Sequence, residues 1–276
     1  MPSNDVLVEI RDRIATMTMN RPDVLNAVHK EMFEEIRSIA LDLDADPEVR
    51  SIILTGAGRG FCSGVDVSGH DFGSVEDRTP AVYPFEGGPG AIYHIRKPTI
   101  AAIGGPAVGV GLGMALACDI RIASENARFT TGLARVGLPA VDGLGWTLPR
   151  IVGEAKALEM IYTADIIDSK EAERIGLISY LTKQEELGST AFDLARRLAE
   201  APPFASYLSK FLVRKGANLD YEQYLPHEYA ASLNNRSYAS HDISEAAQAR
   251  IEKRKPEFKG TSITPRNAAT PRVHRD

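Results

Sequence analysis

Two glycine-rich stretches constrain the fold of this chain more than any other part of its sequence. They span residues 61–67 (FCSGVDV) and 104–113 (GGPAVGVGLG). Each follows an apolar run that predicts a strand, at 51–55 for the first and at 99–103 for the second. Backbone without side chains can approach a ligand closely, and its exposed N–H groups suit an anion or a polarised oxygen. We therefore expect the two stretches to hold one carbonyl oxygen between them, although tight turns alone would also explain the glycines.

The rest of the pattern alternates strands with helices up to about residue 185 and contains only helices after it. This order predicts an α/β core over residues 1–185, a helical segment over 186–260 and a disordered tail over 261–276. Residues 68–90 lack periodicity and predict a long loop. Strands are predicted at 6–10, 14–19, 51–55, 99–103, 118–123 and 177–181, and helices at 28–43, 91–95, 114–117, 148–163, 169–175, 185–201, 203–215, 221–238 and 244–254.

Composition argues against several classes of function. A net charge of −5 offers no strongly basic surface for nucleic acid, and no apolar run reaches the ~18 residues of a membrane span. Cys62 and Cys118 are not in a CxxC pattern and the His residues lack metal-ligand spacing, so we expect reduced thiols and no metal. The first residues lack the basic and apolar parts of a signal peptide, which predicts a cytoplasmic protein.

Six short motifs lie in order between residues 20 and 258. They are NRPDVLNA at 20–27, FCSGVD at 61–66, Ala107 with Gly111 and CDI at 118–120, LPRIVG at 148–153, Ala172 with GLI at 176–178, and EKRKPEF at 252–258. Together and in this order they resemble the crotonase (enoyl-CoA hydratase/isomerase) superfamily. The resemblance implies a spiral core of ββα units, C-terminal helices that mediate a trimer or a dimer of trimers, and an acyl-CoA thioester as ligand, with no separate cofactor.

The resemblance also assigns a role to backbone groups. In this family two N–H groups polarise the thioester carbonyl, and by position they belong to Val65 and Val110. Such donors are each worth about 3 kcal/mol of transition-state stabilisation. The family usually has alanine at the first position and often glycine at the second. Valine changes the shape of the pocket but leaves the N–H in place.

The family's CoA path implies a further set of residues. Lys255 and Phe258 would cover the nucleotide, in the same or a neighbouring subunit. Arg21 and Lys255 are candidate phosphate partners, although an ordinary solvated surface charge is an equally good interpretation of each. The channel for adenine and pantetheine would be lined by Asn26, Ala27, Ser63, Gly64, Val65, Asp66 and Val67.

The two acids of the family's hydratases are missing from this chain. The resemblance places one glutamate after the second glycine stretch and the other after a strand at Phe129, and the residues there are Gly113 and Leu133. Water addition to an enoyl thioester needs one group to deprotonate water and another to protonate the α-carbon. Neither a glycine nor a leucine can do this, so the sequence argues against ordinary hydratase chemistry.

Asp142 is the best remaining candidate for an acid or base. Isomerases, dehalogenases and naphthoyl-CoA synthases of this family carry an acid in the same segment, at the position of Val141 or of Asp142 depending on the member. Burial near Leu133, Val110 and Trp146 would raise the pKa of Asp142, as a proton shuttle needs. Asp142 also precedes a predicted helix and could be its N-cap.

Other side chains are weaker candidates. His94 could act as a base, as a histidine does in the family's dehalogenases, but a lone histidine is more often structural or on the surface. Cys62 beside Ser63 has no fixed base partner and is interpreted as a packed thiol. The remaining candidates are His70 and Asp71 in the long loop, Asp66 within its motif, Tyr83 and Tyr93 as hydrogen-bond donors, and Arg135 beside the acyl group.

The sequence therefore supports several reactions on an acyl-CoA. Double-bond isomerisation comes first, because one acid near the enolate is enough for it. Hydratase or lyase action with an atypical set of groups comes next, and C–C hydrolysis with a pair such as His94 and Asp142 is a further option. The alternative outside the enzymes is a member that binds acyl-CoA without turning it over.

Overall fold

The computed structural model describes residues 4–66, 88–238 and 240–260. A six-stranded sheet has the order β1-β2-β3-β4-β6-β9, and a three-stranded sheet has the order β5-β7-β8. These two mixed sheets, with helices on their faces, confirm the predicted α/β class. The strands are β1 (Val6–Arg11), β2 (Ile14–Met19), β3 (Ser51–Gly56), β4 (Thr99–Ile103), β5 (Pro106–Val108), β6 (Ile120–Ser124), β7 (Arg128–Thr130), β8 (Ile167–Asp168) and β9 (Tyr180–Thr182).

The larger sheet combines one hairpin with a run of parallel strands. β1 and β2 are antiparallel and meet at Asp12 and Arg13, whose positive φ angles are those of a tight hairpin turn. From β2 onwards the neighbours β3, β4, β6 and β9 run parallel. Parallel strands covered on both faces read as continuous apolar runs, which is why β3 and β4 were predictable from the sequence.

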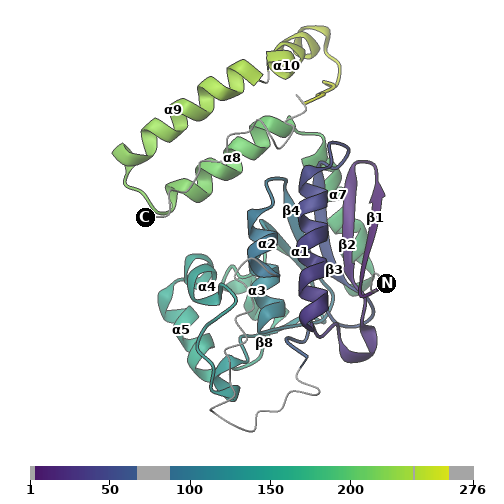
Figure 1. The fold of residues 1–276 in the computed structure, drawn as a ribbon, viewed down its shortest axis with the longest axis vertical. Coiled ribbons are helices and arrows are strands. Elements are labelled where there is room, and N and C mark those ends of the chain that lie inside the picture. The colour runs from purple at the N-terminus through teal and green to yellow at the C-terminus, as the bar shows by residue number, and fades with distance from the viewer. Residues whose placement is uncertain (1–3, 67–87, 239, 261–276) are drawn as a thin grey trace.

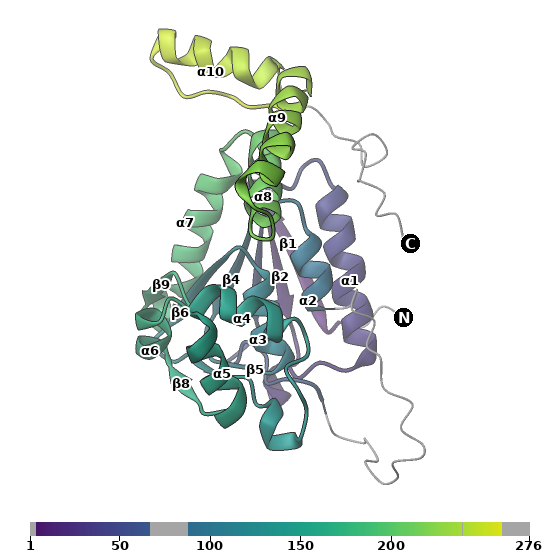
Figure 2. The same cartoon turned by 90° about the vertical axis from the view of Figure 1, so that its left-hand side faces the viewer.

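Helices cover both faces of this sheet. α1 (Lys30–Ala45) and α2 (Pro89–His94) lie on one face, and α7 (Leu187–Ala199) lies on the other (Figures 1 and 2). The buried residues of α7 recur every four positions, a spacing that aligns them on one side of a helix. They pack against the isoleucines of the central strands, in a cluster that contains Leu187, Ala191, Ala195, Ala199, Ile14, Ile53, Ile100 and Ile122.

A second group of helices follows the glycine-rich turn after β4. α3 (Val110–Ala117) is buried along its whole length and belongs to the largest core cluster. It begins at Val110, earlier than the predicted 114–117, and Gly109 is its N-cap. The predicted break at Gly153 is confirmed, since it separates α4 (Leu144–Val152) from α5 (Glu154–Thr163). The remaining short elements here are η1 (Pro22–Val24), η2 (Leu133–Val136), η3 (Gln184–Glu186) and α6 (Ser169–Arg174).

The described residues after β9 form helices and no further strand. α8 (Pro203–Gly216), α9 (Tyr221–Tyr238) and α10 (Ser240–Glu252) extend away from the sheets (Figures 1 and 2). α8 is fastened to the core by Lys210 and Arg214, whose charged groups pair with Asp119 at 2.7 and 2.8 Å. The predicted division at residue 185 stays a prediction, and the predicted tail over 261–276 lies outside the described residues.

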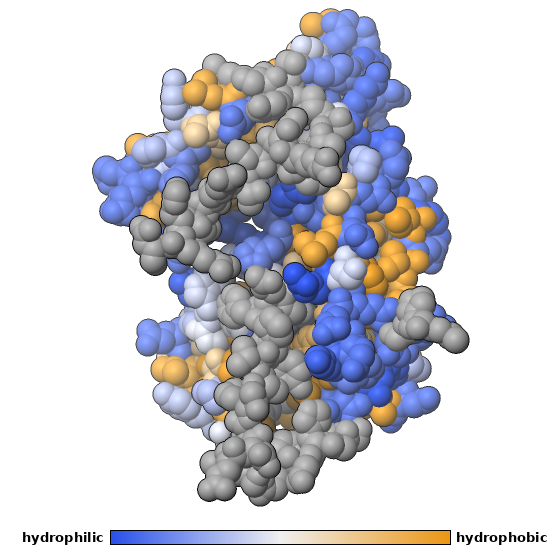
Figure 3. Space-filling view, viewed as in Figure 1, coloured by the Kyte–Doolittle hydropathy of each residue, from blue (hydrophilic) through white to orange (hydrophobic). Residues whose placement is uncertain are grey.

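Hydrophilic residues dominate the face shown in Figure 3, and hydrophobic ones gather in small separate patches. Exposed apolar side chains on the edge strand β1 include Leu7, Val8 and Ile10. None of the helices in the described ranges combines the length and the hydropathy that a membrane crossing requires.

Candidate active site

The described part of the first glycine stretch, residues 61–66, forms an extended segment that hydrogen-bonds on one side to β5. Cys62 N–H donates to Pro106 O and Val108 N–H donates back to Cys62 O, both at 2.9 Å. Gly111 of α3 lies against this pair, since a side chain there would come within 2.7 Å of Cys62 Cβ. The close contact between α3 and the first stretch therefore depends on glycine at position 111.

The other side of the same segment pairs with Val28. Val28 N–H donates to Gly64 O and Asp66 N–H donates to Val28 O, each at 2.9 Å. In a parallel pairing of this kind the central residue, here Val65, directs its own N–H away from the partner. Gly64 has a φ of 110°, which glycine adopts readily, and its Cα faces Val108 of β5. The Val65 N–H is thus left on the side of β5 and α3.

Val110 is the first residue of α3, and its N–H belongs to the first helical turn. The first N–H groups of a helix have no partner within it, and the helix dipole favours negative charge there. Within residues 4–66, 88–238 and 240–260, no group accepts a hydrogen bond from the N–H of Val65 or of Val110. Two available donors therefore lie on neighbouring segments, and their use in catalysis stays a prediction.

Asn26 links the loop before α1 to the first glycine stretch. Its side chain is fully buried, and its amide donates to Ala57 O at 3.0 Å and to Gly60 O at 2.9 Å. Its oxygen accepts from Arg21 N–H at 2.9 Å. Because both ends of this amide are engaged with backbone, Asn26 supports the turn, and its side chain does not offer a free group to a ligand.

The other predicted CoA-channel residues gather around the same turn. Arg21 Nη1 donates to Ala27 O at 2.6 Å and pairs with the carboxylate of Asp66 at 2.9 Å. Ser63 Oγ donates to Val24 O at 3.0 Å. The fold therefore brings the predicted residues of the 20–27 loop next to those of the first stretch. Four predicted candidates, Val67, His70, Asp71 and Tyr83, lie outside the described residues.

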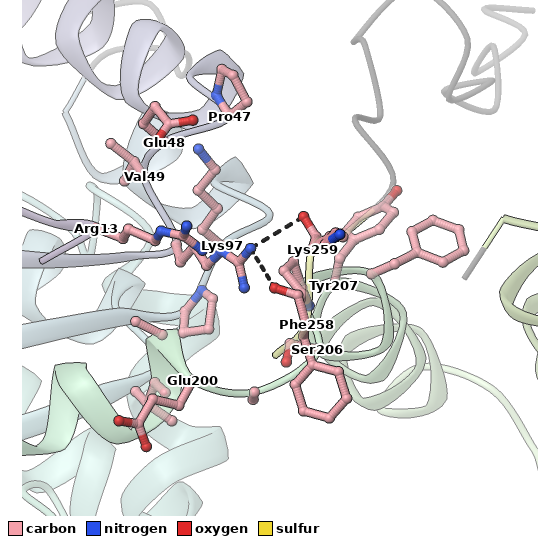
Figure 4. Close-up of a pocket in the computed structure, with 18 of the residues that line it drawn as sticks. Arg13, Pro47, Glu48, Val49, Lys97, Glu200, Ser206, Tyr207, Phe258 and Lys259 are labelled. Carbon is pink, nitrogen blue, oxygen red and sulfur yellow. Dashed lines mark hydrogen bonds between the residues drawn. The ribbon is translucent and has the colours of Figure 1, made fainter. Parts of the chain in front are cut away.

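Lys255 and Phe258 lie elsewhere in the chain. They line a cavity of about 910 Å³ beside the starts of β2, β3 and β4, which Figure 4 shows in close-up. Arg50 Nη2 donates there to Phe258 O at 2.8 Å and to Lys259 O at 3.1 Å, and Lys255 forms an ion pair with Glu200. The glycine stretches follow the opposite ends of β3 and β4. A six-residue strand is roughly 20 Å long, so one chain does not bring Lys255 and Phe258 to the amides of the first stretch.

Asp142 lies beside Gly113, the position where the family's hydratases carry a glutamate. A Cβ on Gly113 would come within 2.6 Å of Asp142 O, 3.2 Å of Asp142 Cβ and 3.3 Å of Pro89 Cγ. The neighbouring Val141 is exposed, so the structure turns Asp142 and not Val141 towards α3. Leu133, at the second position without its glutamate, is buried in η2.

Asp142 is partly buried. Burial raises the pKa of its carboxyl above the usual value, with no opposing charge as a cause. The pKa of the Cys62 thiol is raised to about 12. Burial of the thiol is the largest cause, and the negative charge of Asp142 is a smaller one. The N-cap of α4 is Gly143, with no side-chain cap bond, so Asp142 does not fill the predicted role of helix N-cap. Its role as an acid or base stays a prediction.

The weaker candidates are mostly engaged or exposed. His94 ends α2 at the surface, with its ring 5.6 Å from that of Tyr93. Arg135 is exposed and pairs with Asp165 at 3.8 Å. Cys62 is a buried free thiol, as predicted. Among the described residues, no group of three or more His, Cys, Asp or Glu side chains could hold a metal ion.

One cluster beside the site was missed from the sequence. The Tyr93 ring packs edge-on against Trp146 of α4 at 5.5 Å and has the Arg214 guanidinium 4.0 Å from its centroid. Arg150 lies 4.1 Å over the other aromatic ring, Trp146. No spacing rule in the sequence connects α2, α4 and α8, so only the tertiary structure shows that these side chains form one cluster.

The described residues alternate strands and helices, continue in helices after β9, and contain two glycine-rich turns after the parallel strands β3 and β4. These features define an α/β protein of the crotonase fold. The structure of an enoyl-CoA hydratase from Bacillus anthracis superimposes with a TM-score of 0.86 at 30% identity, over 93% of this chain and 99% of that one.

Sequence comparisons agree with this fold. Residues 9–261 match the profile of the family described as enoyl-CoA hydratase/isomerase. The short-chain-enoyl-CoA hydratase of Clostridium acetobutylicum is 36% identical over 93% of this chain and 98% of its own. The (E)-benzylidenesuccinyl-CoA hydratase of Thauera aromatica is 35% identical over 92% of this chain and 99% of its own. The chain therefore belongs to the enoyl-CoA hydratase/isomerase (crotonase) family and is an acyl-CoA enzyme of that family.

Proposed function

We propose that this enzyme moves a proton on the acyl chain of a CoA thioester and acts as a double-bond isomerase. The observation that carries the proposal is the position of Asp142. Its carboxyl-bearing carbon lies against α3 where the hydratases have an acid, while positions 113 and 133 hold none. A reaction that needs one acid/base group suits this arrangement better than one that needs two.

The N–H groups of Val65 and Val110 would bind the thioester oxygen. They have no acceptor among the described residues, and each is fixed by neighbours that are themselves hydrogen-bonded. Two donors aimed at the oxygen stabilise the enolate more than the ground-state carbonyl, because the charge on that oxygen increases in the transition state. This half of the site would serve any acyl-CoA whose α-carbon loses a proton.

The carboxylate of Asp142 would then carry the proton. For a β,γ-unsaturated thioester it takes a proton from the α-carbon, and the electrons of that C–H bond form the dienolate. The electron pair then returns through the chain, a new α,β double bond forms, and Asp142 gives the same proton to the γ-carbon. The step is balanced without water or cofactor. A raised carboxyl pKa favours this role, because the group must both accept and release a proton near neutral pH.

The CoA portion would follow the loop at residues 20–27 and the first glycine stretch. In this proposal Ala27, Ser63 and Gly64 line the pantetheine path. Arg21 would bind a phosphate while its guanidinium also pairs with the carboxylate of Asp66. Lys255 and Phe258 lie at the opposite edge of the sheet, so any contact with CoA would be to the site of another subunit. A trimer or a dimer of trimers is part of the proposal for this reason.

A second candidate is hydration with an atypical set of groups. It is favoured by the names of the relatives at about 35% identity, which are hydratases. The chain lacks acids at both positions that the resemblance assigns to them, so hydration would require Asp142 with a further group.

The test compares two thioesters under the same conditions. Vinylacetyl-CoA should be converted to crotonyl-CoA by the protein and not by its Asp142→Asn variant, with product followed by chromatography. Crotonyl-CoA should gain water only negligibly. Robust hydration of crotonyl-CoA would replace the isomerase assignment with the hydratase one. Tight binding of both thioesters with no turnover of either would favour a non-catalytic member.

A further inference from the structure

Gly113 and Asp142 compete for the same space. A Cβ on Gly113 would lie 2.6 Å from Asp142 O and 3.2 Å from Asp142 Cβ. The first distance is shorter than carbon–oxygen contacts in folded proteins allow, and the atom concerned belongs to the backbone. A side chain at position 113 and the present position of Asp142 are therefore mutually exclusive.

The loop before α4 is the side of this contact that can move. All residues of α3 are buried, and Gly111 in its first turn packs closely against Cys62. By contrast, residues 134–139 and Val141 are exposed. Densely packed helices resist displacement, whereas exposed loops yield. A larger residue at 113 would therefore push the loop outwards and leave α3 in place.

We propose that Gly113 is a positioning residue: the absence of a side chain there lets the loop hold Asp142 against α3, where it can reach the acyl chain. An acid supplied from α3 and an acid supplied from this loop are then alternatives, and this chain has the second. The catalytic consequence rests on the proposed function, but the placement of Asp142 can be measured without it.

The loop conformation supports this interpretation. Asp142 and Gly143 both have positive φ angles, 57° and 76°, just before α4 begins. Aspartate tolerates this region better than most residues but adopts it only when its surroundings impose it. Contact with the bare Cα of Gly113 is one such constraint. Pro89 of α2 limits the same space, since its Cγ would lie 3.3 Å from a Cβ on Gly113.

The experiment measures the carboxyl of Asp142 directly. The wild-type protein, Gly113→Ala and the control Gly188→Ala are labelled with ¹³C-aspartate, and the Asp142 signal is identified by its loss in Asp142→Asn. In Gly113→Ala the Asp142 pKa should fall towards its ordinary value, because the displaced loop exposes the carboxyl to water. Gly188 lies in α7 with open space around its Cα, so Gly188→Ala should leave the titration unchanged.

Turnover of vinylacetyl-CoA gives the second readout. Gly113→Ala should lower kcat by roughly 10- to 100-fold with a smaller change in KM, because a misplacement of about 1 Å costs this much. Gly188→Ala should keep wild-type kcat. Gly113→Glu should lose isomerisation as well and should not gain hydration of crotonyl-CoA, since its side chain would displace the loop further.

The outcomes separate the two proposals. An unchanged Asp142 titration in folded Gly113→Ala overturns the positioning role, whatever the activity. Normal turnover in Asp142→Asn overturns the proposed function, while the titration still decides the role of Gly113. If Gly113→Ala does not fold, Gly113→Ala with Pro89→Ala opens space on the α2 side only. That double variant should fold and still show the lowered Asp142 pKa, and a wild-type pKa in it would contradict the proposal.

Discussion

The two halves of the candidate site are built in different ways. The half formed by residues 61–66 and the start of α3 is held by backbone hydrogen bonds on both sides, and glycines occupy places where side chains would collide. The half formed by residues 133–143 consists of a short 3₁₀ helix and turns, largely exposed, with Asp142 half-buried at its end. We therefore expect the first half to resist substitution and the second half to tolerate it.

This difference matches what each half would do. Polarising a thioester oxygen is the same task for every acyl-CoA, and it needs N–H donors at fixed positions. Choosing which carbon gains or loses a proton is specific to each reaction, and it depends on one side chain. A loop on a rigid scaffold is where such a side chain can change without loss of the fold.

The largest expected effect comes from the loop half. Asp142→Asn should lower kcat for vinylacetyl-CoA by about 10²–10⁴-fold, the usual contribution of a general acid/base. Binding of butyryl-CoA, measured by calorimetry, should be unchanged, because the donors of the other half remain. Val141→Asn is the matched control, since that neighbour is exposed, and it should keep wild-type turnover. An equal loss in the control would remove the distinction between the two positions.

The glycine half should respond in stability as well as in activity. Gly111→Ala places a methyl group against Cys62 O, which is already bonded to Val108 N–H and cannot move away. We expect a loss of about 3 kcal/mol in the free energy of unfolding, at the upper end of overpacking costs, together with reduced turnover. Urea unfolding measures the first effect. A variant as stable as wild type would show that the two segments are not held in close contact.

A smaller effect should follow from loss of the Asn26 side chain, which donates hydrogen bonds to the turn before the first glycine stretch. Asn26→Ala leaves the part-buried carbonyl of Ala57 and the buried carbonyl of Gly60 without their donor, at a cost of about 2 kcal/mol. Asn20→Ala removes one exposed side-chain bond, to Asn4 O, and should cost much less. Thermal unfolding of the two variants compares them. Similar losses would mean that burial of the Asn26 amide does not matter.

The smallest effect is a pH dependence of stability. Burial raises the pKa of Asp142 in the folded protein, so between the unfolded and folded pKa values the folded state holds more protons. The contribution of Asp142 to stability is therefore fully present below the unfolded pKa, about 3.9, and is lost as pH rises through the folded value. Asp142→Asn should gain stability relative to wild type over that range, measured by urea unfolding at several pH values. A constant difference across pH would contradict the burial of this carboxyl.

Much of the fold was predictable from local patterns. The hairpin of β1 and β2 and the parallel strands β3 and β4 are as expected, because alternating or continuous apolar runs report directly on burial. The start of α3 was placed too late, since a helix rich in glycine and small residues has little amphipathic pattern. β6 and β9 begin later than predicted, because their apolar runs include residues outside the ladder.

The candidate site was predictable only in part. The resemblance assigned the role of donors to the amides of Val65 and Val110, and this assignment stays a prediction, because it follows from the position of a turn and not from a side chain. The resemblance did not show that the Asn26 side-chain amide forms all its hydrogen bonds with the backbone. It also did not show that Gly113 lies against Asp142. Those facts depend on segments that are distant in the sequence.

The sequence by itself determined the order of the elements, the two glycine turns and the absence of acids at positions 113 and 133. Residue identity and local conformational preference are enough for these. Only the tertiary structure decided that Asp142 faces α3 while Val141 is exposed, and that Lys255 and Phe258 lie at the far edge of the sheet. The physical reason is that side-chain direction and distance across a fold are set by how remote segments pack together, and no local pattern records it.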